Sequence, residues 1–275
     1  MNVPFWLERA FHRVTDRIYA RLPQPVPDRQ RLSNCQIVSH RGEHDNRTVL
    51  ENTLSAFDRA QQSGIWGIEC DIRWTRDLQP VVFHDRDLQR LFGMALALGD
   101  LTRRELGAEF PMIPSLEEVI CRYGKKLHLM VEIKENQCDP LRQTRILRNL
   151  FSVLKPRDHF HVLSLTPALF RQMDFLPTSA FLPVAELNTR QVSGLALREN
   201  YAGMAGHYLF LSASLIRRHA KHGQKLGTGY ISSRNSLYRE LNRGIEWIFS
   251  NTASKLQAIA VRASDPDSQI HRRAR

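Results

Sequence analysis

Short apolar runs alternate with amphipathic stretches from residue 35 onward, and the apolar runs have the length and composition of buried strands. Eight strands are predicted, at 35–39, 67–73, 127–133, 159–164, 180–185, 204–211, 225–231 and 245–250. Helical stretches fit between most of them, at 53–63, 114–123, 139–154, 166–174, 212–222 and 234–243. Such repeated strand–helix alternation predicts a parallel (β/α)₈ barrel, a TIM barrel, as a single domain over residues 31–260.

One apolar run, at 80–85, does not fit the alternation. Only residues 74–79 separate it from the second strand, and a segment that short cannot hold the crossover that a parallel neighbour needs. We therefore expect a short hairpin inside the loop after strand two. With the turn centred near Asp77 and Leu78, the hairpin would place His84 opposite Asp71.

The two ends of the chain differ from the barrel pattern. Residues 4–22 predict an amphipathic helix whose apolar residues recur at steps of three and four, namely Leu7, Phe11, Val14, Ile18 and Leu22. Prolines at 23, 25 and 27 end it, so that residues 1–30 form a helix and a stiff linker. The helix either packs against the floor of the barrel or lies on an anionic membrane surface. Residues 261–275 predict a polar, basic tail.

Composition narrows the choice of partner. A chain that is 42% hydrophobic and 24% charged folds, and a net charge of +11 attracts anionic partners. The basic residues are scattered and accompany no nucleic-acid-binding motif, so we expect no nucleic-acid partner. No apolar run is long enough to span a membrane, and charged residues interrupt any signal peptide. We expect a cytoplasmic location, with peripheral contact to the inner face of the membrane if the N-terminal helix binds lipid.

Polar side chains follow the predicted carboxyl ends of the first three strands and of the hairpin. They are His40, Arg41, Glu69, Asp71, His84, Glu132 and Lys134. Active sites of parallel barrels form at this end, and the two-residue period of a strand places Glu69 and Asp71 on one face. We expect the seven side chains to meet in the barrel mouth.

Three carboxylates gathered in a barrel mouth would repel one another unless a cation neutralised them. Oxygen ligands favour a hard ion, so Glu69, Asp71 and Glu132 predict a site for Mg²⁺ or Ca²⁺. His40 and His84 suit general acid and base catalysis, and Arg41 and Lys134 suit contacts with phosphate oxygens. Together these residues predict metal-assisted phosphoryl transfer.

The run HRGEHDNRTVLENTLSAFDRAQQSGIWGIECDIRWTRDLQPVVFHDRDLQRL, over residues 40–91, resembles the signature of the glycerophosphodiester phosphodiesterase family. The later stretches IPSLEEV at 113–119 and VEIK at 131–134 follow in the family's order. The resemblance implies a (β/α)₈ barrel, a divalent metal on the three carboxylates, and His40 and His84 as acid and base. Two stretches depart from the family: Gly229–Ser232 replaces Trp-Thr-Val-Asn, and Ser250-Asn251 replaces Thr-Asp.

Three functions remain open from the sequence. The leading hypothesis is hydrolysis of a glycerophosphodiester to glycerol phosphate and an alcohol. A lysophospholipase D that acts on membrane lysophospholipids would use the same chemistry, and the N-terminal helix and the missing tryptophan favour it. A basic barrel that binds anionic lipid without turnover is the non-enzymatic alternative.

Overall fold

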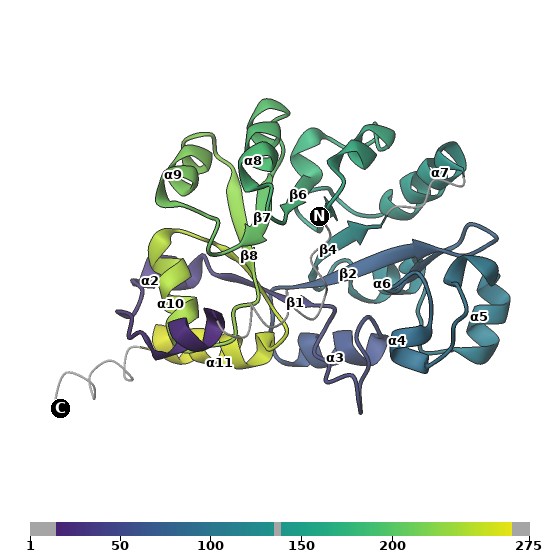
Figure 1. Ribbon diagram of the computed structural model, residues 1–275, viewed down its shortest axis with the longest axis horizontal. Coiled ribbons are helices and arrows are strands. Elements are labelled where there is room, and N and C mark those ends of the chain that lie inside the picture. Colours follow the sequence, from purple (N-terminus) through teal and green to yellow (C-terminus); the bar gives the residue numbers. More distant parts are fainter. Residues whose placement is uncertain (1–14, 135–138, 266–275) are drawn as a thin grey trace.

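The computed structural model describes residues 15–134 and 139–265. Eight parallel strands form a closed barrel in the order β1-β9-β8-β7-β6-β5-β4-β2, and β2 returns to β1. Helices surround it (Figure 1). The strands are β1 (Gln36–His40), β2 (Gly67–Trp74), β4 (His128–Ile133), β5 (Phe160–Ser164), β6 (Phe181–Ala185), β7 (Gly203–His207), β8 (Lys225–Gly229) and β9 (Trp247–Ser250). The predicted barrel is confirmed.

Most strands are followed by an α-helix that returns the chain to the floor of the barrel. The α-helices are α2 (Arg29–Ser33), α3 (Leu54–Gln62), α4 (Gln89–Phe92), α5 (Arg103–Glu109), α6 (Leu116–Tyr123), α7 (Pro140–Phe151), α8 (Thr189–Arg198), α9 (Ala213–Lys221), α10 (Arg234–Arg243) and α11 (Ala253–Ser264). Short 3₁₀ helices are η1 (Leu98–Asp100), η2 (Pro167–Gln172) and η3 (Thr178–Ala180). The helix predicted at 166–174 is therefore a 3₁₀ segment, which covers more length per residue in this short connection.

The predicted hairpin is present, but its register is shifted by one residue. Strand β3 (Pro80–Val82) pairs antiparallel with β2, with Ile72 opposite Val82. The backbone of Phe83, not of His84, bonds to Asp71 (N···O 2.9 Å). The expectation that His84 lies opposite Asp71 is wrong, because the turn is centred on Asp77 and Leu78 takes a left-handed conformation (φ 60°).

Apolar side chains form two separate layers, one on the outer side of the strands and one on their inner side. The larger one lies between the strands and the surrounding helices, and a smaller one fills the barrel interior with Val38, Met130, Leu163 and Trp247 among its members. A third cluster lies beneath α4 and α5, the segment that follows the hairpin. The packed interior leaves the polar residues at the strand ends as the natural place for a site.

The described part of the N-terminal segment does not lie under the barrel. Residues 15–21 are helical. Asp16 bonds to Ser236 in the first turn of α10, and Pro25 accepts a bond from Asn242 near its end, so the segment follows α10 along the barrel wall. Two residues of the predicted apolar stripe, Ile18 and Leu22, are 54% and 46% exposed. These two residues are not buried against the floor of the barrel, which is one of the two alternatives for the helix, and contact of the helix with a membrane stays a prediction. The rest of the stripe, with Leu7, Phe11 and Val14, lies outside the described residues.

The two predicted domain boundaries, at residues 30 and 260, do not coincide with the ends of helices. The boundary at residue 30 falls inside α2, and the boundary at residue 260 falls inside α11, which continues to Ser264. Both helices contact each other and α10, so they pack with the barrel. Within the described residues, none of the helices combines the length and the apolar character needed to cross a bilayer.

Candidate active site

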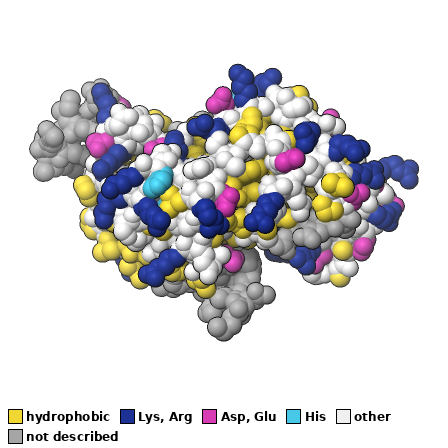
Figure 2. All heavy atoms as spheres, turned by 90° about the horizontal axis from the view of Figure 1, so that it is seen from above, with side chains coloured by type: hydrophobic (Ala, Val, Ile, Leu, Met, Phe, Trp, Pro, Cys, Tyr) yellow, Lys and Arg dark blue, Asp and Glu magenta, His cyan; other side chains and the backbone are white. Residues whose placement is uncertain are grey.

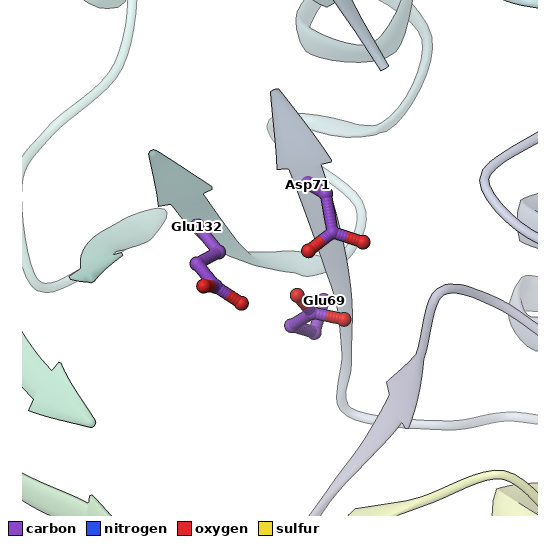
Figure 3. A group of neighbouring side chains, drawn as sticks. All are labelled: Glu69, Asp71 and Glu132. Carbon is purple, nitrogen blue, oxygen red and sulfur yellow. The ribbon is translucent and has the colours of Figure 1, made fainter. Parts of the chain in front are cut away.

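The three predicted carboxylates meet in the mouth of the barrel. Ligand-type oxygens of Glu69, Asp71 and Glu132 all lie within 4.8 Å of one another. Figure 3 shows the carboxyl groups converging between β2 and β4. The register explains this convergence, because Asp71 pairs with Glu132 across the two strands and Glu69 lies one pleat below Asp71 on the same face.

Burial makes this cluster electrostatically unusual. Burial, together with the charges of Asp71 and Glu132, raises the pKa of Glu69 well above its usual value. Burial alone would also raise the pKa of Asp71, but Lys134 and Arg41 outweigh it and lower that pKa well below its usual range. Among the described residues, Oε1 of Glu69 has no hydrogen-bond partner although it is buried. An unpartnered carboxylate oxygen beside two other carboxylates fits a hard divalent cation.

The two predicted phosphate-binding residues contact the carboxylates. Lys134 Nζ lies 2.9 Å from Asp71 Oδ1 and 2.6 Å from Glu132 Oε1. Arg41 Nε lies 3.1 Å from Asp71 Oδ2, and its Nη1 donates to Glu51 Oε1 at 2.8 Å. Both cations therefore neutralise the acidic cluster, and their contacts with phosphate stay a prediction.

His40 ends β1 at the edge of the acidic cluster. Its Nδ1 donates to Oδ1 of Asn251 at 2.6 Å, so Nε2 is the free nitrogen, 3.8 Å from Glu69 Oε2. Burial, with a smaller effect from Arg41, lowers the pKa of His40 to about 3. His40 is thus held as a neutral imidazole with a lone pair facing the site.

An aromatic ring lies beside His40 even though the family's tryptophan is missing. The ring centroid of Tyr230, the residue after β8, is 6.1 Å from that of His40. Tyr230 has a positive φ of 65°, an uncommon conformation for a bulky residue, and the residue is 41% exposed. Substitution at Gly229–Ser232 therefore keeps an aromatic wall near the site.

His84 is oriented by a series of hydrogen-bonded charged side chains. Its Nδ1 donates to Oδ1 of Asp85 at 2.6 Å, and Oδ2 of Asp85 accepts from Arg90 Nε at 2.6 Å. Arg90 also donates to Glu51, which accepts from Arg41. Burial would raise the pKa of Glu51, but Arg90 and Arg41 outweigh it and lower that pKa. The series links both sides of the mouth and orients the His84 ring.

Sequence reasoning missed several supporting residues around the site. Asn52 donates to Asp71 Oδ2 at 2.8 Å from a left-handed backbone conformation (φ 58°), and Glu51 joins the two arginines. Their signal in the sequence was the Glu-Asn-Thr string before α3, where Thr53 caps the helix. Gly42 is also required, since a Cβ there would lie 2.7 Å from Cβ of Ala56 and its φ is 78°.

The fold and this arrangement define a (β/α)₈-barrel protein with an acidic site suited to a divalent cation and two oriented histidines. The profile of the glycerophosphoryl diester phosphodiesterase family matches residues 40–207. The chain therefore belongs to this family, as its sequence motifs predict.

Individual relatives extend over different parts of the chain. A glycerophosphodiester phosphodiesterase from Caldanaerobacter subterraneus subsp. tengcongensis is 25% identical and covers 80% of this chain and 95% of its own length. The Bacillus subtilis protein YhdW is 37% identical over 109 residues, which span 36% of this chain and 44% of YhdW. An Oleispira antarctica phosphodiesterase, solved with its product sn-glycerol-3-phosphate, superposes with a TM-score of 0.70 at 23% identity. That likeness covers 82% of this chain and 96% of that one, and it shows a shared fold.

Proposed function

We propose that this protein hydrolyses glycerophosphodiesters to glycerol phosphate and an alcohol, with a divalent cation, Mg²⁺ or Ca²⁺, held by Glu69, Asp71 and Glu132. The observation that carries the proposal is the convergence of three carboxylates, two of them buried and that of Glu132 partly buried, beside two oriented histidines. Membership of the family and the product bound to the Oleispira antarctica relative support this substrate class. When bound, the cation would polarise the phosphoryl oxygens and neutralise the developing charge.

The hydrogen bonds behind the histidines distinguish their roles. Asn251, a neutral amide, leaves His40 uncharged with a free Nε2, which suits a base that accepts a proton from the attacking water. Asp85 accepts from Nδ1 of His84 and fixes the orientation of that ring, which suits a residue that passes a proton to the departing alcohol. Lys134 and Arg41 would then hold phosphate oxygens beside the carboxylates.

The release of glycerol phosphate from glycerophosphocholine tests this proposal. His40→Ala and His84→Ala should each lower turnover by about two to four orders of magnitude, the usual contribution of a positioned acid or base. His222→Ala is a matched control, because His222 is exposed at the end of α9, where it bonds to the carbonyl of Arg218. Normal turnover in both site variants would refute the acid–base roles.

A lysophospholipase D activity at the same site is the second candidate. It is favoured by the exposed apolar residues Ile18 and Leu22, which would allow peripheral contact of residues 1–22 with a membrane. Comparing turnover of lysophosphatidylcholine and glycerophosphocholine by the full chain distinguishes the two substrates. A preference for the soluble diester would count against the lipid substrate. The lysophospholipase D activity stays a prediction, and so does the cytoplasmic location on the inner face of the membrane.

A further inference from the structure

Exposed apolar side chains gather on the loops at the mouth of the barrel. Each follows a strand at its carboxyl end, which is also the end that carries the acidic site. Leu165 and Tyr230 come directly after β5 and β8, and Leu187 and Phe210 come shortly after β6 and β7. Leu141 lies in the first turn of α7. We call these five residues, Leu141, Leu165, Leu187, Phe210 and Tyr230, the apolar rim.

The rim is exposed to an extent that folding does not explain. Leu141 is 84% exposed and Leu187 is 72% exposed, and the other three rim residues are about 40% exposed. Single exposed apolar residues are common, but a series on successive loops at one end of a barrel indicates a binding surface.

Three arginines lie at the same end of the barrel as the rim. Arg142, Arg190 and Arg234 are all exposed and occupy the first turns of α7, α8 and α10. The partial positive charge of a helix N-terminus disfavours a cation there, so the helices themselves gain nothing from these side chains. Within the described residues, none of the three forms an ion pair. The arginines therefore call for an anionic partner.

We propose that the apolar rim and these three arginines dock the mouth of the barrel onto an anionic phospholipid surface. Leucine and phenylalanine side chains would enter the boundary between headgroups and acyl chains, and the arginines would meet lipid phosphates. A second copy of this chain is a poorer partner, because it would bring arginines against arginines. Nucleic acid offers phosphate but nothing that would cover protruding leucines.

The net charge of the protein does not explain why the mouth of the barrel, and not another face, would dock onto the lipid surface. Figure 2 shows Lys and Arg side chains dispersed over the face that it draws, among acidic and apolar side chains. What distinguishes the mouth is the combination of the rim with three arginines that form no ion pair with any described residue. Docking would turn the acidic site toward the lipid surface. The docking itself does not depend on the proposed function, whereas a role in lipid hydrolysis rests on it.

Flotation of the full chain with vesicles tests the docking. The vesicles contain phosphatidylcholine with about a third phosphatidylglycerol, and pure phosphatidylcholine vesicles serve for comparison. Leu187→Ser combined with Phe210→Ser should lower the partition coefficient at least about tenfold. Val153→Ser combined with Val261→Ser is the matched control, since these residues are 58% and 59% exposed at the opposite end of the barrel. The control should leave partitioning unchanged.

A charge variant tests the second half of the surface. Replacing Arg142, Arg190 and Arg234 by glutamine should lower binding to the anionic vesicles by about fivefold for each arginine and weaken its salt dependence. The control replaces three exposed cations at the floor, Lys125, Arg218 and Lys221, and keeps the same net charge as the test variant.

Several outcomes would overturn the docking proposal. Equal vesicle binding by rim and floor variants, or no binding by the full chain, would do so. A dimer in light scattering that only the rim variants dissociate would make the rim a self-interface instead. Thermal melting and turnover of glycerophosphocholine show whether each variant is folded. A chain that binds vesicles through the rim but cleaves no diester would overturn the proposed function alone.

Discussion

Two histidines buried in the barrel interior should make the protein sensitive to mild acid. His128 and His161 are each 5% exposed, and Nδ1 of His161 lies 2.8 Å from Nε2 of His128. His128 Nδ1 donates to the carbonyl of Asp158, so Nε2 of His128 must accept from His161. Trp66 stacks on His128, and Trp247 packs against His161. This arrangement requires a neutral His128 ring, because its Nε2 must keep the lone pair that accepts from His161.

The size of the effect follows from the two pKa values. Burial lowers the pKa of His128 to about 4 and that of His161 to about 3, whereas both would titrate near 6.5 in the unfolded chain. Between those values the unfolded state binds more protons, so the free energy of unfolding falls as the pH drops below about 6.5. Each histidine contributes about 1.4 kcal/mol per pH unit, or roughly 3 to 4 kcal/mol for the pair between pH 7 and pH 5.

Urea denaturation at pH 7, 6 and 5 measures this dependence. Between pH 7 and pH 5, the double variant His128→Phe and His161→Leu should lose roughly 3 to 4 kcal/mol less free energy of unfolding than the unmodified chain loses. This difference is independent of the stability that the variant has at pH 7. His222→Gln removes an exposed histidine and should leave the dependence as it is. If the double variant loses as much stability between pH 7 and pH 5 as the unmodified chain, the two rings are not held neutral by burial.

Two further predictions concern the support of the site. Asp85→Asn should lower kcat about tenfold to a hundredfold with KM nearly unchanged, because His84 loses its charged partner, and Asp87→Asn on the same exposed loop should have no effect. Equal kinetics of the two variants would remove Asp85 from the mechanism. Gly42→Ala should reduce both stability and turnover through its clash with Ala56. Gly194→Ala meets no atom within 4 Å inside α8 and should instead stabilise the protein by about 0.5–1 kcal/mol, as thermal melting will show.

The barrel and the meeting of the three carboxylates in its mouth could be predicted from the sequence because both depend on local patterns. Eight apolar runs at regular intervals leave few alternatives to a parallel barrel, and the residues after each run must then share one end. Glu69 and Asp71 are two apart on a strand, so their common face follows from the pleat alone. Burial and register confirm what the pattern predicted for these two carboxylates.

What the sequence could not supply depends on conformations that few residues adopt. Leu78 has a positive φ, which is uncommon for leucine, and the register of the hairpin differs by one residue from the expected one. The chain from His84 through Asp85 and Arg90 to Glu51 joins residues up to 39 positions apart. Its members are ordinary charged residues in loops, and only the folded arrangement shows that they touch. The same holds for Asn251, whose contact with His40 spans 211 positions.

The most direct test of the central claim is the rate of glycerol phosphate release from glycerophosphocholine by protein stripped with a chelator. Glu69, Asp71 and Glu132 bring their oxygens within 4.8 Å of one another, a geometry and a ligand type that suit a hard divalent cation. Release should be absent in excess EDTA and should return when Mg²⁺ or Ca²⁺ is added in excess of the chelator. Glu69→Gln should not recover under the same conditions. Undiminished release in excess EDTA would contradict the metal-dependent mechanism.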